Sequence, residues 1–274
     1  MPMNGQSVKP LVADRMSERL ITIATMLGDG SCDSQDVSKE KKSGFRVADV
    51  GCDHGYISIY LVQSGIASAA IAMDVRKGPL SGARDNISEY GLENAISTRL
   101  SDGLKELSEG EADSLVIAGM GGKLMMRILE EGNPRTLGIE RAILQPQSEL
   151  SEFRSYIREK GYSILDEKIV FEDGKYYFPM RICFSQKSTD YLSGAINELM
   201  RVNECNRDIA LNICNRFGEI NILRKDKLLK KYCEHGLEVS RSILKNLSED
   251  EHRERILQVK NDSYELETVL RYFA

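Results

Sequence analysis

The sequence predicts an α/β protein with a mostly parallel sheet, followed by an all-helical region. From residue 46 onward, short continuous apolar runs alternate with segments of helical periodicity, which is typical of parallel strands covered by helices on both faces. Two apolar-rich segments then follow with only a short polar turn between them, and this predicts a terminal antiparallel hairpin. After about residue 190 the strand patterns end and Leu and Ile recur at helical spacing.

The elements can be placed in chain order. The first is an amphipathic helix over 14–27, with Met16, Leu20, Ile23 and Leu27 at helical spacing. The expected parallel strands are 46–50, 69–73, 96–100, 114–118 and 141–145. The helices expected between and after them are 56–64, 79–90, 121–131 and 149–159. The hairpin uses YSILDEKIVFED and KYYFPMRICFSQ, and a terminal hairpin favours a methyltransferase-type Rossmann sheet over a dehydrogenase, whose sixth strand is parallel.

We expect three regions: a flexible tail at 1–13, a Rossmann-like domain at 14–189 and a helical domain at 190–274. Residues 28–44 are polar and show no periodicity, so they predict a mobile surface loop. The helical domain has helical patterns through Leu192, Ile196 and Leu199, through Ile209, Ile213 and Phe217, and over about 223–247 and 249–272. Ser248 is the expected N-cap of the last helix, with Glu251 three residues on. These helices are expected to pack as a hairpin or three-helix unit.

Composition limits the classes of protein. No apolar run approaches 18 residues and the N-terminus lacks the apolar core of a secretion signal, so neither a membrane span nor export is expected. The six cysteines form no Cys-x-x-Cys pair and there are only three histidines, which disfavours a structural zinc site and fits a reducing, cytoplasmic setting. The net charge of −5 argues against binding nucleic acid over the whole surface but allows a local basic patch. Nothing in the sequence marks an obligatory protein partner.

The stretch RVADVGCDHGYISIYL (46–61) places a glycine turn directly after the first strand. Gly51 lets the backbone approach a ligand, and Gly55 eases the start of the following helix. A dinucleotide site prefers Gly-x-Gly-x-x-Gly, whose N–H groups face a pyrophosphate. Here the carboxylates of Asp49 and Asp53 would repel a diphosphate, so a cationic or zwitterionic ligand is favoured and a nicotinamide-dependent oxidoreductase is not.

S-adenosyl-L-methionine is such a ligand. Asp74 closes the second strand, where a carboxylate can accept hydrogen bonds from both ribose hydroxyls, and Asp102 follows the third, where it can accept one from the adenine amino group. An acid after each of three consecutive strands is more specific than any one acid alone. The remaining residues expected at this cofactor site are Cys52, His54, Gly103, Gly119 and Met120. No metal is expected.

The residues that end the fourth and fifth strands indicate which substrates are favoured or disfavoured. The fourth ends in AGMGG (118–122) and lacks the Asn/Asp-Pro-Pro-Tyr motif of enzymes that methylate an exocyclic base amine. That chemistry is therefore disfavoured. Gln145 and Pro146 end the fifth strand, where they either line the substrate side or only terminate the strand.

Several blocks resemble the bacterial tRNA (adenine-22-N1)-methyltransferases, in that family's order. The blocks are SERLITIA (17–24), ADVGCDHGYIS (48–58), KGPLSGARDNI (77–87), SDGL (101–104), IAGMGG (117–122), LQP (144–146) and EDGKYY (172–177). The likeness covers about 14–180, and beyond 190 only the helical character matches. It implies a class I fold, S-adenosyl-L-methionine as methyl donor, and a coiled-coil-like C-terminal domain that helps to hold tRNA. The chain departs from the family at Asp74, where Glu is frequent, and in its longer 28–44 loop.

The resemblance also implies that Asp53 is the acid most important for activity. We hypothesise that its carboxylate accepts a hydrogen bond from the adenine N6 amino group, which pushes electron density toward N1 and stabilises the cation that methylation creates. His54 either contacts the methionine end of the cofactor, orients Asp53, or only bonds the backbone. Tyr56 either stacks on a flipped adenine or packs in the core.

Contacts to the tRNA itself are expected from basic residues. By resemblance Arg19 has a role at the substrate, although a solvated helix face beside Glu18 is the alternative. Lys227, Lys230 and Lys231 lie in the basic stretch RKDKLLKK (224–231), which either binds the tRNA backbone or forms a solvated face with ion pairs. Two other functions stay open: a small-molecule methyltransferase with a helical lid, and a non-catalytic protein that binds S-adenosyl-L-methionine or RNA.

Overall fold

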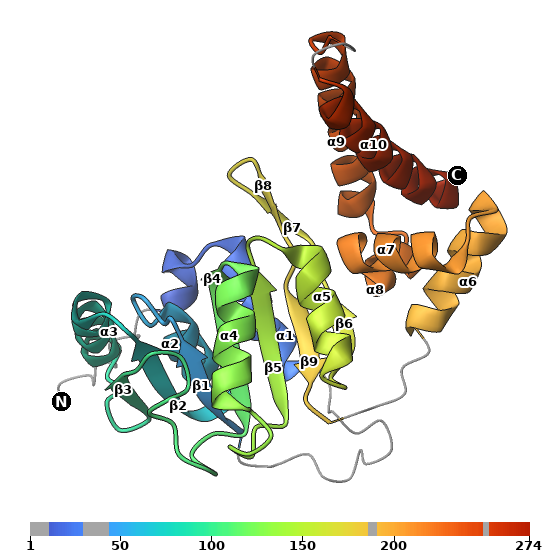
Figure 1. Cartoon of the computed structure of the whole chain (residues 1–274). Coiled ribbons are helices and arrows are strands. Elements are labelled where there is room, and N and C mark those ends of the chain that lie inside the picture. Colours follow the sequence, from blue (N-terminus) through green and yellow to red (C-terminus); the bar gives the residue numbers. More distant parts are fainter. Residues whose placement is uncertain (1–10, 30–43, 186–190, 249–251) are drawn as a thin grey trace, which may run out of the picture.

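The computed structural model describes residues 11–29, 44–185, 191–248 and 252–274, and it confirms the expected mostly parallel sheet (Figure 1). Seven strands lie in the order β3-β2-β1-β4-β5-β9-β6. Their bounds are β1 Phe45–Val50, β2 Ala67–Asp74, β3 Ile96–Leu100, β4 Ser114–Met120, β5 Arg141–Pro146, β6 Ser163–Glu167 and β9 Met180–Cys183. Strands β1 to β5 are parallel, whereas β9 is antiparallel to both of its neighbours.

Helices cover both faces of the sheet, because its strands are apolar on both sides. The helices are η1 Val12–Arg15, α1 Glu18–Gly28, α2 Tyr56–Gln63, α3 Lys77–Glu89, α4 Gly122–Gly132 and α5 Leu150–Glu159. Val47 packs in one apolar cluster with α1, α2 and α3, whereas its neighbour Ala48 packs in another with α4 and α5. This alternation is the two-residue period of a strand buried on both faces.

The expected N-terminal tail and the 28–44 loop lie largely outside the described residues. The packed domain includes residues before 14, because Val12 is fully buried at the start of η1 and its N–H donates to Gln63 Oε1 at 3.0 Å. Residues 12 and 13 therefore belong to the packed domain.

The terminal hairpin is divided into two parts. Strands β6 and β9 pair at the edge of the sheet, and the residues between them form a separate two-stranded ribbon of β7 Val170–Glu172 and β8 Lys175–Tyr177. Pro179 has no N–H to donate, which interrupts a continuous ladder just before β9. Because β5 and β6 are both antiparallel to β9, β6 ends at the carboxyl edge of the sheet. The ribbon extends beyond that edge (Figure 1).

The C-terminal region is all-helical, as expected. Its helices are α6 Tyr191–Asn203, α7 Arg207–Phe217, α8 Glu219–Leu223, α9 Lys227–Lys245 and α10 Arg253–Phe273. The last two pack side by side as a helical hairpin (Figure 1). Helix α10 begins at Arg253 after His252, so Ser248 is not its N-cap, and Glu251 lies outside the described residues. Within the described part of the chain, no helix is long and apolar enough to cross a membrane.

An arginine that belongs to a buried ion pair of the sheet domain also joins that domain to the helical region. Arg154 of α5 and Glu167 of β6 are both fully buried, with Nε donating to Oε1 at 2.7 Å. The same guanidinium donates through Nη1 to the backbone carbonyls of Asn215 and Arg216 at the end of α7, at 2.9 and 3.0 Å. Arg224 donates to the carbonyl of Glu167 at 3.1 Å. These bonds fix α7 and α8 against α5 and β6.

Candidate active site

The glycine turn between β1 and α2 is held in left-handed backbone conformations. Gly51, Asp53 and Gly55 have φ of 76°, 48° and 73°, and Asp is among the few non-glycine residues that tolerate this region. The Gly51 N–H donates to the carbonyl of Met73 at 2.8 Å, which ties the turn to the end of β2. The positive φ of Gly51 strains any other residue there, and a Cβ would also lie 2.2 Å from Cε of Met120, whose side chain would have to move.

This turn lines a cleft of about 960 Å³ at the carboxyl edge of the sheet. The cleft lies where β2 and β4 flank β1, which is the switch point of the strand order. The residues predicted from the sequence that line it are Arg19, Asp49, Gly51, Cys52, Asp53, His54, Tyr56, Asp74, Asp102, Gly103, Gly119 and Met120. All the residues expected at the cofactor site thus meet in one cleft.

Two of its acids are buried. Asp49 accepts a hydrogen bond from the Ser58 hydroxyl at 2.7 Å, and burial raises the pKa of its carboxyl to about 6. Asp74 is also buried, and its Oδ1 accepts the backbone N–H of Arg76 at 2.8 Å. Burial raises the pKa of the Cys52 thiol as well, with Asp49 and Asp74 adding to the effect. Cys52 is therefore a neutral thiol in the cleft wall.

Asp102 differs because its side chain is 40% exposed and paired with two cations. Lys105 Nζ lies 2.6 Å and Arg127 Nη2 lies 3.2 Å from its carboxylate oxygens. These two hydrogen bonds lower the pKa of Asp102, so it is ionised at neutral pH.

Asp53 is the most accessible of the four cleft acids. Its side chain is 64% exposed, and Oδ2 lies 3.9 Å from Nε2 of His54. The His54 ring stacks on Tyr56 at 5.9 Å between centroids, and its backbone carbonyl accepts a hydrogen bond from Asn86 Nδ2 at 2.9 Å. The His54 ring thus lies beside Asp53, and the Asn86 bond involves the carbonyl of His54 and not its ring. The role of the ring stays a prediction. Tyr56 both lines the cleft and packs against the core.

Arg19 lies in the wall of the cleft, not on a solvated helix face. Its Nη1 donates to Gln145 Oε1 at 2.9 Å, and its guanidinium lies 4.8 Å from the centre of the Tyr177 ring. The Glu172 carboxylate accepts its backbone N–H at 3.0 Å. Arg19 therefore connects α1, β5 and the ribbon at the edge of the cleft.

Gln145 and Pro146 do not line the cleft, contrary to one of the two alternatives. Both are buried, because β5 continues through Pro146, which pairs with Met120 of β4. The next residue, Gln147, lines the cleft and donates its N–H to the Met120 carbonyl at 2.8 Å. Leu20, Val75, Leu124 and Arg127 also line it and were not predicted. Their only signal in the sequence is their place just after a strand or in a helix.

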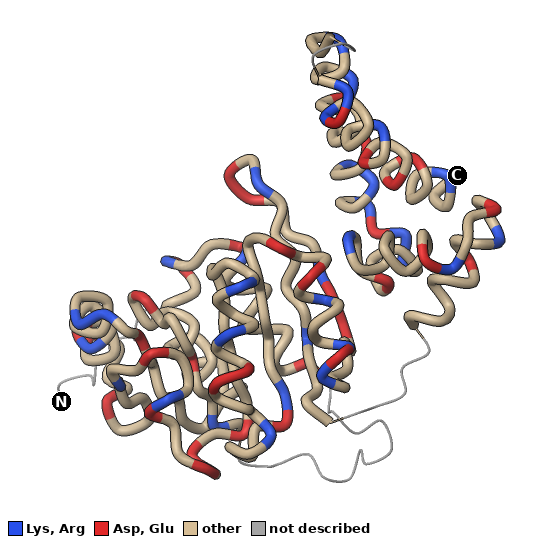
Figure 2. Tube along the Cα trace, in the orientation of Figure 1, with Lys and Arg blue, Asp and Glu red and all other residues tan. Residues whose placement is uncertain are grey.

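The three lysines of α9 lie outside the residues that line the cleft. Lys227, Lys230 and Lys231 are exposed in the first turns of the helix. Figure 2 shows that basic and acidic residues are interspersed along the C-terminal helices. Lys230 Nζ lies 4.0 Å from Glu234, whereas Arg224 of the same basic stretch is engaged with Asp166 at 2.6 Å. The three lysines of α9 are therefore exposed, whereas Arg224 binds groups of the sheet domain.

A parallel sheet with a glycine turn after its first strand and acids after its first three strands defines a Rossmann-like protein with a ligand site at its switch point. A family model described as a methyltransferase domain matches residues 16–180, so the chain belongs to this methyltransferase family.

Known proteins resemble the chain beyond this domain assignment. The tRNA (adenine(22)-N(1))-methyltransferase of Bacillus subtilis is 38% identical over 163 residues, 60% of this chain and 63% of that protein's length. The crystal structure of the B. subtilis m1A22 tRNA methyltransferase has 28% identity and a TM-score of 0.70, covering 93% of this chain and 98% of that one. A putative tRNA (m1A22) methyltransferase of Streptococcus pneumoniae, solved with S-adenosyl-L-methionine, has 27% identity and a TM-score of 0.71, covering 93% and 99%. The structural likeness covers more of the chain than the sequence alignment does.

Proposed function

We propose that this protein transfers a methyl group from S-adenosyl-L-methionine to N1 of an adenine in tRNA, at position 22. One observation carries the proposal: an exposed aspartate, Asp53, is held in a left-handed turn and shares a cleft with the buried carboxylates of Asp49 and Asp74. The names of the similar proteins from B. subtilis and S. pneumoniae support the substrate and the position.

The cleft fits the proposed methyl donor. Gly51 leaves bare backbone beside the ligand, and the surrounding acids suit a zwitterion that carries an ammonium and a sulfonium. Asp49 would complement the ammonium, Asp74 would accept the ribose hydroxyls, and Asp102 would lie at the adenine end. When bound, S-adenosyl-L-methionine supplies an electrophilic methyl group.

The chain's own contribution is to position and activate the target base. Adenine N1 has an in-plane lone pair and needs no deprotonation. Asp53 accepts a hydrogen bond from the N6 amino group, which increases the electron density at N1 and stabilises the developing positive charge. Tyr56 supplies an aromatic face for the base, and Arg19 contacts the substrate at the edge of the cleft. Holding the base in line with the donor is the other main source of rate enhancement.

The helical region would hold the body of the tRNA. Lys227, Lys230 and Lys231 present positive charge on α9, which suits phosphate oxygens. Among the described residues, Cys52, Cys205, Cys214 and Cys233 carry free thiols, which fits a reducing cytoplasm, where tRNA is found.

The test is the mass of nucleosides from unmodified tRNA incubated with the protein and the methyl donor. We expect 1-methyladenosine from the wild type, none from a transcript with guanine at position 22, and a loss of about 100-fold or more in kcat for Asp53→Ala. Asp53→Asn keeps the shape and removes the charge, so it should be similarly impaired. Affinity for S-adenosyl-L-methionine, measured by calorimetry, should be unchanged in both variants because Asp53 acts on the base.

Other outcomes would contradict the proposal in distinct ways. Binding of the methyl donor without any product from tRNA would indicate a small-molecule substrate or a non-catalytic protein, and methyl transfer to a metabolite extract separates these two. Wild-type turnover by Asp53→Ala would remove the role given to Asp53.

A further inference from the structure

Among the described residues 11–29 and 44–185, five large apolar residues are exposed: Leu11, Val75, Leu100, Leu124 and Phe171. Leu11 directly precedes η1. Val75 and Leu124 line the cleft, and Leu100 directly precedes cleft residues 101–103. Phe171 does not line the cleft, yet its side chain is 47% exposed on the ribbon beyond the same edge of the sheet. An exposed phenylalanine costs solvation free energy, and the cleft does not account for it.

The two faces of the ribbon have different partners. Phe171 and Tyr176 are cross-strand partners on one face, with ring centroids 4.6 Å apart. Glu172 lies on the other face, toward α1, where its carboxylate contacts Arg19 of the cleft wall. Because successive side chains of a strand alternate, the face that carries Phe171 points away from α1.

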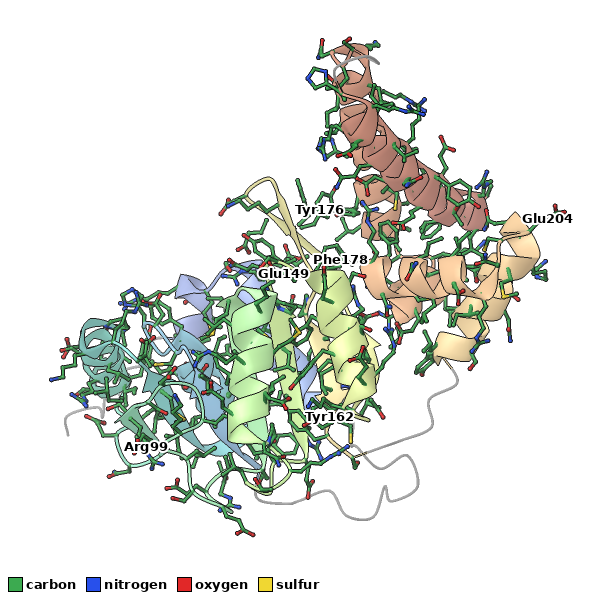
Figure 3. All side chains as sticks on the ribbon, viewed as in Figure 1. Arg99, Glu149, Tyr162, Tyr176, Phe178 and Glu204 are labelled. Carbon is green, nitrogen blue, oxygen red and sulfur yellow. The ribbon has the colours of Figure 1, made fainter. Side chains whose placement is uncertain are left out.

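The Phe171 face is turned toward the helical region. Tyr176 points from the ribbon toward α9 (Figure 3), and its ring centroid lies 5.1 Å from that of Tyr232 in α9. Lys231 is one residue before Tyr232, and Lys227 is one turn earlier on the same face of the helix as Lys231. The aromatic face of the ribbon therefore contacts α9 in the same turns of the helix that carry the exposed lysines.

We propose that Phe171 is a stacking surface for a nucleobase of the tRNA other than the target adenine. The inference rests on the proposed function: one face of the ribbon contacts Arg19 of the cleft wall and the other contacts α9, so a tRNA held by both the cleft and the α9 lysines would lie along the ribbon. A phenylalanine ring has few rotamers to lose and is already packed on Tyr176, so it binds a base at low entropic cost. The Glu172 carboxylate, which would repel phosphate, is engaged by Arg19.

The chain has no tryptophan, so a single introduced indole reports on its own surroundings. In Phe171→Trp, stacking of a base should quench the indole emission on addition of unmodified tRNA, and S-adenosyl-L-methionine alone should not. Leu257→Trp is the matched control, because Leu257 is 62% exposed on α10 and lies outside the cleft and the ribbon. Its emission should change far less. Equal quenching in both variants, or in neither, would overturn the inference.

Kinetics give an independent readout. Phe171→Ala should raise the KM for tRNA about tenfold, the loss expected for one base-stacking contact, with kcat and affinity for the methyl donor unchanged. Phe171→Tyr should retain the wild-type KM, whereas Phe171→Leu, which is apolar without a ring, should not. If the wild type methylates tRNA but Phe171→Ala has the wild-type KM, the stacking surface is wrong and the proposed function stands. If the wild type does not act on tRNA, the proposed function itself fails.

Discussion

Replacing Arg154 by Met should be strongly destabilising, because it removes one partner of a fully buried ion pair. Arg154 and Glu167 have no exposed side-chain surface, and their hydrogen bond is 2.7 Å long. The same arginine also satisfies the carbonyls of Asn215 and Arg216. Breaking a buried pair in this way costs about 3–5 kcal/mol, since the remaining charge loses its compensation. We therefore expect the free energy of unfolding to fall by about 4 kcal/mol.

A second ion pair with the same distance but an exposed position serves as the control for the effect of burial. Arg15 and Glu89 also approach to 2.7 Å, but their side chains are 47% and 44% exposed. Arg15→Met should consequently cost far less than Arg154→Met, because solvent screens an exposed ion pair. Both variants can be measured by urea unfolding followed by circular dichroism. A second transition should be looked for, because the helical region has a hydrophobic cluster distinct from the two clusters of the sheet. An Arg154→Met loss no larger than that of Arg15→Met would refute the reasoning.

The pH dependence provides a second check on the same pair. Burial raises the pKa of Glu167, and Arg154 opposes that rise. Without Arg154 the pKa of the native Glu167 carboxyl should lie still further above that of the unfolded state. The free energy of unfolding should then fall as the pH rises, because deprotonation leaves an uncompensated buried charge in the native state. The loss in Arg154→Met should therefore grow as the pH rises above the ordinary range for a carboxyl group, and adding Glu167→Leu should restore part of it.

Two further predictions concern the cleft and α9. The native Asp49 carboxyl takes up a proton at about pH 6 and its unfolded form at 3.8, so its contribution to the free energy of unfolding increases as the pH falls between these values. Asp49→Asn, which still accepts from Ser58, should lose this part of the pH profile in thermal unfolding, and an unchanged profile would contradict the burial effect. Reversing the charge of Lys227, Lys230 and Lys231 should weaken tRNA binding and reduce the slope of log affinity against log salt by roughly 2–3. Filter binding at several salt concentrations measures both, and an unchanged slope would exclude these lysines from the tRNA contact.

Much of the candidate site could be predicted because its residues occur where strands end. Asp49, Asp74 and Asp102 close or follow the first three strands, and parallel strands bring their carboxyl ends to one edge. The position of Gln145 was harder to predict, because a shift of one position along a strand moves a side chain to the other face of the sheet. Only the pairing of Pro146 with Met120 shows that β5 continues past it.

The sequence by itself determined which segments are strands and helices, where the glycine turn lies and which acids face a common edge. These properties follow from periodicity and from backbone preferences that act over a few residues. The tertiary structure alone decided that Arg154 of α5 reaches the end of α7, and that the terminal hairpin forms a ribbon with Phe171 turned toward α9. Those contacts join residues far apart in the chain. The energetic effect of a buried charge or an exposed ring depends on the partner that folding places beside it, which the local sequence does not specify.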